Sequence, residues 1–348
     1  MKFVLPIKIE KDCEYYFELE KALKDYADEI CKFDIDDEIK FCVKDINSQI
    51  LRAVELFYSS KISEAVELMK DLYSLLKDKK DFVTVASKLY SKEEVFIGKE
   101  IYYKARVGET NDSFNSQAML HIPFNLRGRV QNQRFSISGC PCIYLGKTSY
   151  VTWLELQKPV YSQMFVSGCK VDDSIRIVNL ACTNWVEIEK KKDFDDIVIY
   201  PLIIATSFVV QEKDRCFHSE YIISQLFMQV VAEQEINGIA YLSKQMQDYP
   251  YHYPLNLCLA IIAKQENRYE ALTALKENII MSNAINYGEF LSLPLPEKGD
   301  PYMGDDSCYN KLMTNFSATN FKYGFSDFYQ FDKYIRKSFN DLIKNVNL

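Results

Sequence analysis

The chain is poor in the residues that interrupt regular structure. Its 348 residues include only 11 glycines and 10 prolines, and neither type occurs between Pro6 and Gly98. This scarcity excludes long flexible linkers and is typical of packed helices joined by short turns. Hydrophobic residues make up 48% of the chain and charged residues 26%, which excludes a disordered or collagen-like protein.

Histidine is also scarce, since His121, His218 and His252 are the only three. The ten cysteines are irregularly spaced and contain no C-x-x-C pair, so the sequence offers no clustered zinc ligands. We expect no metal cofactor, and we expect the cysteines to be reduced thiols.

Long apolar runs are missing as well. No run approaches the roughly 18 residues of a membrane span, and the first twenty residues become charged too early for a secretory leader. We therefore expect a cytoplasmic protein without a membrane partner.

The net charge is −7, and it is unevenly distributed. Residues 1–100 hold 17 basic and 22 acidic residues, which gives a local charge of −5. A broad electrostatic contact with nucleic acid is therefore not expected. Arginines gather further along the chain, at Arg106, Arg127, Arg129 and Arg134.

Apolar residues recur with helical spacing in residues 10–95. This pattern predicts an antiparallel bundle of three or four helices. Its first helix would bury one face, on which only Glu20 is polar, made by Cys13, Tyr16, Phe17, Glu20, Leu23, Tyr26, Ala27 and Ile30. A later helix would bury Ile62, Ala65, Val66, Met69, Leu72, Tyr73 and Leu76.

Strands and helices mix after Val95 without a repeated strand–helix–strand rhythm. The predicted strands include 101–107, 142–145, 165–171, 175–180, 238–243 and 255–262. The predicted helices are 148–156, capped by Thr148 or Ser149, then 220–233 and a tail over 327–346. The sequence thus predicts an α+β fold that follows an all-α N-terminal bundle.

Residue chemistry singles out the segment from Arg106 to Glu155. An arginine beside a Ser- and Gly-rich loop can pair its planar fork with a diphosphate, although a single arginine is more often solvated surface charge. Tyr144 lies in an apolar strand, where it either fills the core or stacks on a flat heterocycle. Glu155 follows Trp153 and Leu154 in a helix, and it either faces solvent or acts in a cleft.

These residues carry a resemblance to the RES domain family. The motifs are Q-R-F-S-I-S-G (133–139), I-Y-L-G (143–146), W-L-E (153–155) and G-I-A-Y-L-S (238–243). They stand in the family's order and at its spacings over about residues 100–265, with Arg134, Tyr144, Glu155 and Ser243 in the four core positions. The departures are Lys104 for an arginine, Gln133 for a glycine and Ser224 for a proline.

The resemblance implies an ADP-ribosyltransferase-like fold and NAD as the substrate. Glu155 would then stabilise the developing positive charge, Arg134 would hold phosphate or ribose oxygens, and Tyr144 would stack on nicotinamide. Ser243 would position the ribose or Glu155, and Arg106 would be a second anion contact. The acceptor of ADP-ribose would be water, phosphate or a protein, and the family implies a bacterial toxin or defence effector with a separately encoded antitoxin.

Residues 1–95 resemble the HEPN-type helical domain that precedes some RES domains. Catalytic HEPN ribonucleases use an R-x4–6-H motif, but no histidine precedes His121. We therefore expect a non-catalytic module, with the RES domain over 96–348. Its amphipathic helices would pack on the RES domain or on a second copy of the chain. The alternative reading is a non-enzymatic binding or assembly protein, with the bundle as its working part.

Overall fold

The computed structural model describes residues 3–10, 13–89, 101–212, 214–246, 254–294, 315–316 and 321–344. The expected domain boundary near residue 95 lies outside these residues. The chain divides into two compact units. Unit 1 comprises Met1–Thr84, Gln131–Gly139 and Arg176–Lys244, and unit 2 comprises Val85–Val130, Cys140–Ile175 and Gln245–Leu348.

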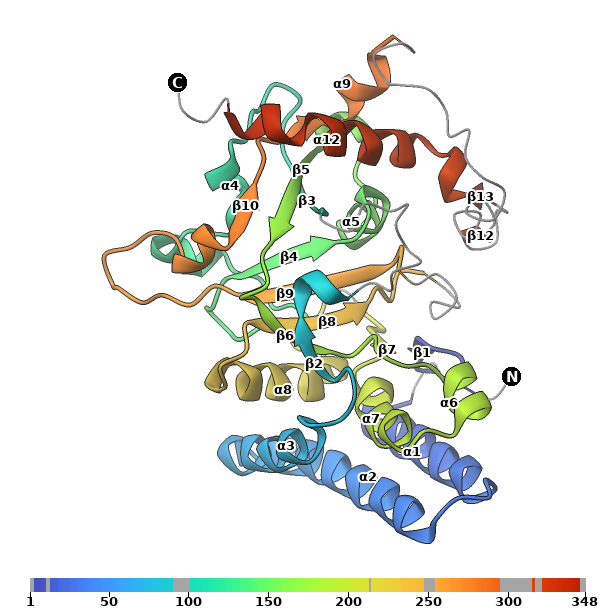
Figure 1. Cartoon of the computed structure of the whole chain (residues 1–348). Helices are drawn as coiled ribbons and strands as arrows, with labels where there is room; N and C mark the ends of the chain where they lie inside the picture. The colour runs from blue at the N-terminus through green and yellow to red at the C-terminus, as the bar shows by residue number, and fades with distance from the viewer. Residues whose placement is uncertain are drawn as a thin grey trace. The chain divides into compact units, whose positions relative to one another are not determined.

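Helices dominate unit 1, and Figure 1 labels them. They are α1 (Tyr15–Cys31), α2 (Asp37–Tyr58), α3 (Ile62–Leu76), α6 (Trp185–Lys191), α7 (Phe194–Ala205), the single turn η5 (Ser219–Tyr221) and α8 (Ile222–Glu233). Its short strands pair in parallel, β1 (Ile7–Lys8) with β7 (Phe208–Val209) and β6 (Arg176–Asn179) with β8 (Gly238–Leu242). The strand β2 (Val83–Val85) spans the boundary between the units.

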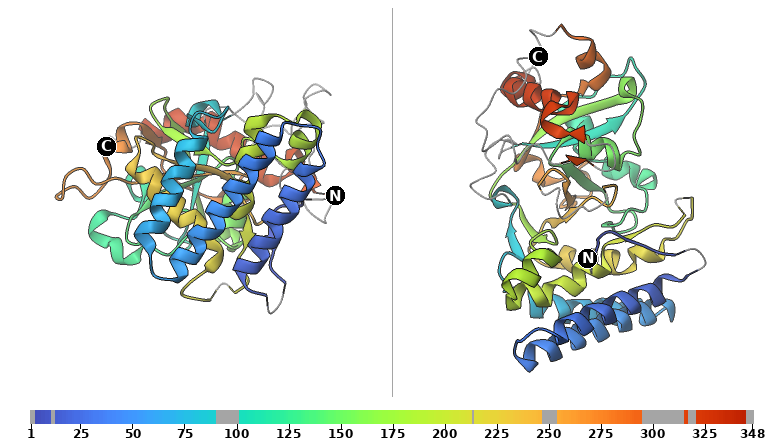
Figure 2. Two further views of the ribbon diagram at one scale, coloured as in Figure 1. Left: turned by 90° about the horizontal axis from the view of Figure 1, so that it is seen from below. Right: turned by 90° about the vertical axis from the view of Figure 1, so that its right-hand side faces the viewer.

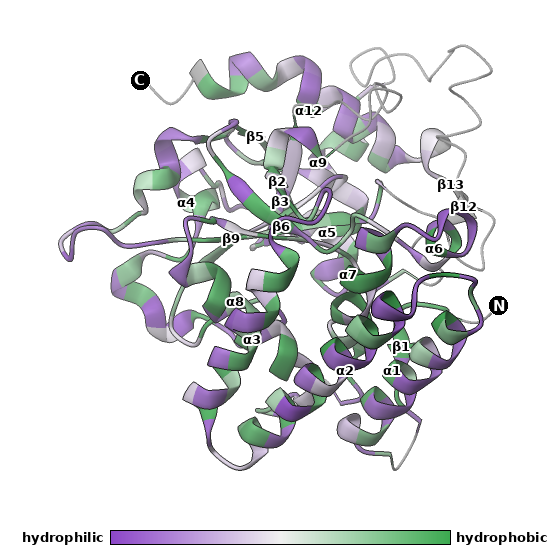
Figure 3. Ribbon diagram, turned by 60° about the horizontal axis from the view of Figure 1, so that its bottom comes forward, coloured by the Kyte–Doolittle hydropathy of each residue, from purple (hydrophilic) through white to green (hydrophobic). Residues whose placement is uncertain are grey.

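The N-terminal helices form one layer of unit 1, as the left view of Figure 2 shows. Helices α2 and α3 contact one another, α2 also contacts α7, and α3 contacts α8. Hydrophilic and hydrophobic residues alternate along α1, α2 and α3 in Figure 3, as expected for helices with one buried face. The prediction of N-terminal helices is confirmed, and these helices share their compact unit with α7 and α8.

The predicted buried face of α1 is partly wrong. The buried residues are Tyr15, Leu19, Leu23, Tyr26, Ala27 and Ile30. Phe17, which was expected inside, is 60% exposed, and its ring lies edge-on to Tyr16. Leu23, Tyr26, Ala27 and Ile30 are buried as predicted, and the error lies in the first turns, where aromatic residues stand on both flanks of the buried stripe. The α3 stripe is confirmed from Ala65 to Leu76, whereas Ile62 is 36% exposed.

Helix α7 is buried on all sides, because every residue from Ile197 to Ala205 is buried. Its Pro201 has no N–H group and therefore leaves the carbonyl of Ile197, four residues earlier, without its helical donor. The Tyr26 hydroxyl of α1 supplies the missing donor at 2.8 Å. This bond ties the N-terminal layer to α7.

Tyr26→Phe is expected to lower the free energy of unfolding by about 1–3 kcal/mol, because it leaves a buried carbonyl oxygen without a donor. The matched control is Tyr16→Phe on the same helix, whose hydroxyl donates to Glu55 in a partly exposed pair that water can replace. Urea denaturation measures both variants. Equal losses of unfolding free energy in the two variants would show that the Tyr26–Ile197 hydrogen bond stabilises the fold no more than the Tyr16–Glu55 bond does.

Unit 2 is built on an antiparallel sheet with the strand order β10-β5-β3-β4-β9. These strands are β3 (Tyr102–Val107), β4 (Cys142–Gly146), β5 (Met164–Val171), β9 (Leu257–Ile262) and β10 (Ile279–Met281), and β11 (Ile285–Asn286) also pairs with β5. The helices are α4 (Ser116–Leu120), α5 (Ser149–Glu155), α9 (Tyr287–Ser292) and α12 (Asp327–Lys344). The 3-10 turns are η1 (Ala86–Lys88), η3 (Phe124–Arg129), η4 (Tyr161–Gln163), η7 (Ala274–Glu277) and η9 (Tyr323–Phe325), and β12 (Asn315–Phe316) pairs with β13 (Phe321–Lys322).

Side chains of the C-terminal helix fasten α5 to the sheet. The carboxylate of Asp332 on α12 accepts hydrogen bonds from the Ser149 N–H, at 3.1 and 3.2 Å, and from the Tyr323 hydroxyl. The Tyr103 hydroxyl on β3 donates to the Asp332 carbonyl at 3.0 Å. Burial raises the pKa of Asp332 to about 6, although the hydrogen bonds from Ser149 and Tyr323 oppose that shift.

The α+β fold class is confirmed, with N-terminal helices followed by a mixed sheet. Thr148 caps α5 as predicted, with its side chain accepting from the Val151 N–H. The predicted tail helix is confirmed over Asp327–Lys344, and its last residues, 345–346, lie outside the described part of the chain. No helix of the described residues is both long enough and apolar enough to cross a bilayer.

Candidate functional site

Arg134 lies on the Gln131–Gly139 segment of unit 1. Its Nη1 donates to the Thr206 carbonyl at 3.3 Å and its Nη2 to the Leu242 carbonyl at 3.1 Å. The guanidinium also lies over two rings, 4.8 Å from the centre of Phe135 and 4.3 Å from that of Tyr241. Four contacts of this kind fix the plane of the side chain.

None of these four partners neutralises the positive charge of Arg134. Its hydrogen bonds go to carbonyl oxygens, and no carboxylate within the described ranges forms an ion pair with it. A guanidinium has five N–H donors in a fixed fork. A half-buried, oriented and uncompensated arginine is therefore suited to bind an anion such as a phosphate.

The segment that carries Arg134 is itself well anchored. The Ser136 hydroxyl accepts from the Gln133 N–H at 3.0 Å and donates to the Gln133 carbonyl at 2.8 Å. Gln225 on α8 donates to the same carbonyl at 3.0 Å. The Phe135 ring packs 4.8 Å from that of Tyr241 on β8. Arg134 is thus presented by a turn that is braced from two sides.

Ser243 directly follows β8 and is fully buried. Its peptide neighbour Leu242 supplies the carbonyl that accepts from Arg134. On the other side, the Lys244 ammonium donates to the Phe208 carbonyl. The structure therefore brings Arg134 and Ser243 together at the end of β8.

Ser243→Ala is expected to lower NAD turnover at least tenfold with little change in melting temperature, if the hydroxyl positions the ribose or the catalytic carboxylate. A serine that only bonds a neighbouring carbonyl would instead cost about 1 kcal/mol of stability and leave turnover per folded molecule unchanged. Turnover and melting temperature measured on one preparation separate the two. Unchanged turnover removes Ser243 from the site.

Tyr144 lies in unit 2, in β4, as the sequence predicts. Its ring is half-buried, and its side chain is hydrogen-bonded to that of Cys142, two positions earlier on the same face of the strand. Burial raises the pKa of the Cys142 thiol to about 12, and the hydrogen bond from Tyr144 partly opposes this rise. The thiol is thus protonated at neutral pH.

Glu155 is the last residue of α5 and is exposed. Thr148 caps this helix, and the indole N–H of Trp153 donates to the Pro159 carbonyl at 2.9 Å. The exposure of Glu155 leaves its carboxylate accessible to a ligand.

Arg106 lies near the end of β3 and is exposed. Its Nη1 donates to the Ala118 carbonyl at 3.1 Å, and its guanidinium lies 4.3 Å from the centre of the Phe114 ring. Both contacts attach the loop that follows β3. Arg106 therefore holds the segment after β3 in place, whether or not it also binds an anion.

Of the five predicted residues, Arg134 and Ser243 belong to unit 1, and Arg106, Tyr144 and Glu155 belong to unit 2. Arg134 and Ser243 meet at Leu242. In unit 2, the side chain of Tyr144 contacts Cys142, whereas that of Arg106 contacts Ala118 and Phe114. Tyr144 and Arg106 therefore have different surroundings.

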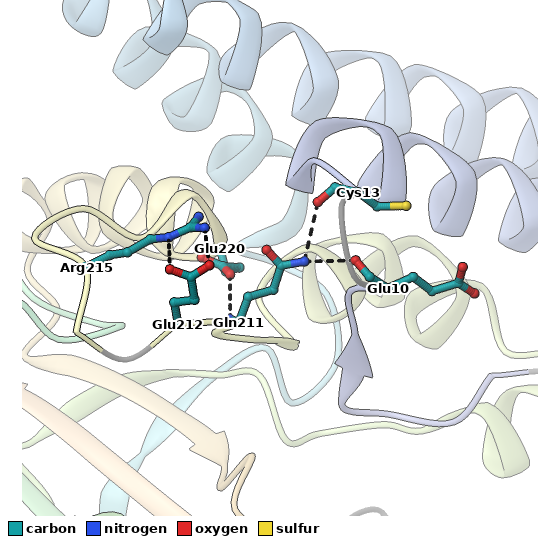
Figure 4. Close-up of polar contacts among 6 residues, drawn as sticks. All are labelled: Glu10, Cys13, Gln211, Glu212, Arg215 and Glu220. Atoms are coloured by element: carbon teal, nitrogen blue, oxygen red, sulfur yellow. Dashed lines mark hydrogen bonds and ion pairs between the residues drawn. The ribbon is translucent and has the colours of Figure 1, made fainter.

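Sequence reasoning missed a pocket of about 850 Å³ in unit 1. It lies where the start of α1, the end of α2, the stretch after β7 and η5 converge, and its lining includes Glu14, Tyr58, Gln211, Arg215 and Glu220. Figure 4 shows the polar contacts made by Gln211, Arg215 and Glu220 of this lining. None of the five predicted residues lines this pocket. Its residues come from three separate stretches of chain, 9–15, 58 and 211–220, so no local motif could have revealed it.

Among the described residues, no three or more His, Cys, Asp or Glu side chains are arranged to hold a metal ion. The nine cysteines among these residues are free thiols.

Comparison with known proteins gives one informative relative. No protein-family model matches the chain, and no solved structure matches it. The chain is 30% identical over 209 residues to a Bacillus subtilis (strain 168) protein named "Putative toxin YopC". The match covers 55% of this chain and 47% of that protein, so this chain spans about half the length of the relative that it resembles.

Proposed function

We propose that this protein is a toxin that consumes NAD by cleaving its nicotinamide–ribose bond. Two similarities support the proposal. The relative in Bacillus subtilis carries the name of a toxin. The order and spacing of Arg134, Tyr144, Glu155 and Ser243 resemble those of the NAD-consuming RES family.

The observation that carries the proposal is the environment of Arg134. Its guanidinium is oriented by two carbonyl oxygens and two aromatic rings, and its positive charge has no carboxylate partner within the described residues. Holding such a charge half-buried costs free energy, which an anionic ligand recovers. The diphosphate of NAD is an anion of the required kind.

The proposed reaction breaks the bond between ribose C1′ and the nicotinamide nitrogen. Nicotinamide leaves as a neutral molecule and takes the bonding electron pair, so no general acid is needed. The ribose passes through an oxocarbenium-like state, as in glycoside hydrolysis. In this proposal Glu155 stabilises that positive charge and Tyr144 stacks on nicotinamide. Ser243 orients the ribose, and Arg134 and Arg106 bind the anionic phosphate oxygens.

The acceptor distinguishes three versions of the same chemistry. Water yields ADP-ribose and a proton, phosphate yields a phosphorylated ADP-ribose, and a protein side chain yields an ADP-ribosylated target. The proposed setting is the cytoplasm, where a separately encoded antitoxin would restrain the enzyme. The N-terminal helices, which the proposal treats as a non-catalytic HEPN-like module, would serve in assembly or regulation.

The proposal is tested by incubating the purified protein with NAD, with and without phosphate, and identifying the products by mass spectrometry. Release of nicotinamide is the expected result, and the second product identifies the acceptor. Adding a cell extract supplies protein acceptors for a transferase. An absence of nicotinamide under all three conditions would favour the alternative, a binding or assembly protein.

A further inference from the structure

The 850 Å³ pocket of unit 1 has the dimensions of a small-molecule site, since such sites span roughly 300–1,000 Å³. Carboxylates and tyrosines are prominent in its lining, which includes Glu14, Tyr15, Tyr58, Glu212 and Glu220. The proposed NAD chemistry uses none of these residues.

Glu220 is the most deeply placed of the carboxylates, with 5% of its surface exposed. One of its oxygens, Oε1, accepts from the Gln211 N–H at 2.9 Å. The side chain of Gln211 is in turn anchored, because its Nε2 donates to the carbonyls of Glu10 at 3.0 Å and Cys13 at 3.4 Å (Figure 4). The second oxygen of Glu220 has no hydrogen-bond donor among the described residues, although the side chain lines the pocket. This second oxygen can therefore accept a hydrogen bond from a ligand in the pocket.

The one arginine in the lining, Arg215, does not supply that donor. It forms a fork with Glu212, in which Nε lies 2.9 Å and Nη2 2.5 Å from the two carboxylate oxygens. This pair is neutral as a unit. The charges of Glu14 and Glu220 therefore remain, and the described lining carries a net charge of −2.

Glu14 is not used by the helix that it precedes. It occupies the N-cap position of α1, but its side chain makes no capping hydrogen bond. The partial positive charge at a helix N-terminus is about half an elementary charge, which offsets only part of two full negative charges. The electrostatic balance of the pocket thus favours a cation.

Two tyrosines complete the environment. The Tyr15 hydroxyl is occupied by the Ala205 carbonyl at 3.2 Å, so this residue offers the pocket its ring surface. Burial raises the pKa of Tyr58, and repulsion by Glu14 and Glu220 adds to the rise, while a hydrogen bond with Ser219 opposes it. Aromatic rings beside carboxylates favour organic ammonium groups over bare metal ions, because the ring faces attract a desolvated organic cation.

We propose that this pocket is a binding site for a small organic cation with one or more primary ammonium groups, with Glu220 as the buried anchor and Glu14 as the outer contact. The proposal is independent of NAD consumption. A polyamine fits the required size and charge, and the ammonium group would donate to the free oxygen of Glu220.

Spermidine is the probe, and isothermal titration calorimetry at 150 mM salt measures its binding to the full chain. Wild type is expected to bind one equivalent. Glu220→Gln keeps an acceptor for the Gln211 N–H but removes the charge, and it is expected to weaken binding roughly tenfold or more. Glu14→Gln, at an exposed position, is expected to weaken it about threefold.

Glu187→Gln is the matched control, because it removes the same charge from a partly exposed residue of unit 1 that pairs with Lys191 and does not line the pocket. Its affinity should equal that of wild type. If circular dichroism shows that Glu220→Gln does not fold, the proposal is tested by comparing the spermidine affinities of Glu14→Gln and Glu187→Gln. Absence of spermidine binding to the wild-type protein overturns the proposal. Equal weakening in Glu14→Gln and Glu187→Gln also overturns it, because binding would then reflect general attraction by the net charge of −7.

Discussion

Replacing Glu155 by Gln is expected to slow NAD turnover by roughly 10² or more. The substitution keeps the volume and most hydrogen-bonding capacity of the side chain but removes its charge. One electrostatic contact to a developing charge typically contributes a factor of about 10²–10³ to the rate. Glu155 ends a short helix that is capped and braced, and it is exposed, so the change should not disturb the fold.

Glu277→Gln is a suitable control, because Glu277 is another exposed carboxylate of unit 2. It should leave turnover unchanged. Circular dichroism and melting temperature should match wild type for both variants. A folded Glu155→Gln protein with turnover near that of wild type would falsify the assignment of this carboxylate.

Arg134→Lys is expected to weaken NAD binding about tenfold, although the substitution keeps the positive charge. Lysine is a point charge without a planar fork, so it cannot hold the carbonyls of Thr206 and Leu242 while it also pairs with two phosphate oxygens. It would also lose the stacked contacts with the rings of Phe135 and Tyr241. Calorimetry with NAD on catalytically slow Glu155→Gln protein measures the affinity without turnover.

The same substitution at Arg129 is the control, since Arg129 is an exposed arginine only five residues away. It should leave the affinity unchanged. Equal affinities of the Arg134→Lys and Arg129→Lys proteins would mean that Arg134 serves only to join the 131–139 turn to β8.

The helices were predictable because their apolar periodicity is strong. The α3 stripe from Ala65 to Leu76 and the Thr148 cap of α5 follow directly from residue type and spacing. The buried face of α1 follows only in part from its sequence, because Phe17 and Tyr15 are similar in hydrophobicity and only the partners of the helix decide which is buried. The Tyr26–Ile197 bond joins residues 171 positions apart, and local sequence carries no signal for it.

The candidate site shows the same division. The turn around Arg134 and the strand position of Tyr144 follow from local pattern, and they are where the sequence places them. The contact of Arg134 with Leu242 depends on long-range packing across 108 residues. The pocket around Glu220 needs three stretches of chain to converge, so only the folded structure reveals it.

The most direct test of the central claim is the NAD content of bacterial cells that express this chain. Wild-type protein is expected to lower cellular NAD severalfold and to arrest growth, whereas Glu155→Gln, expressed to the same level, should leave both near those of cells with an empty vector. Growth arrest with unchanged NAD would contradict NAD consumption, and so would NAD depletion of equal extent by the two proteins.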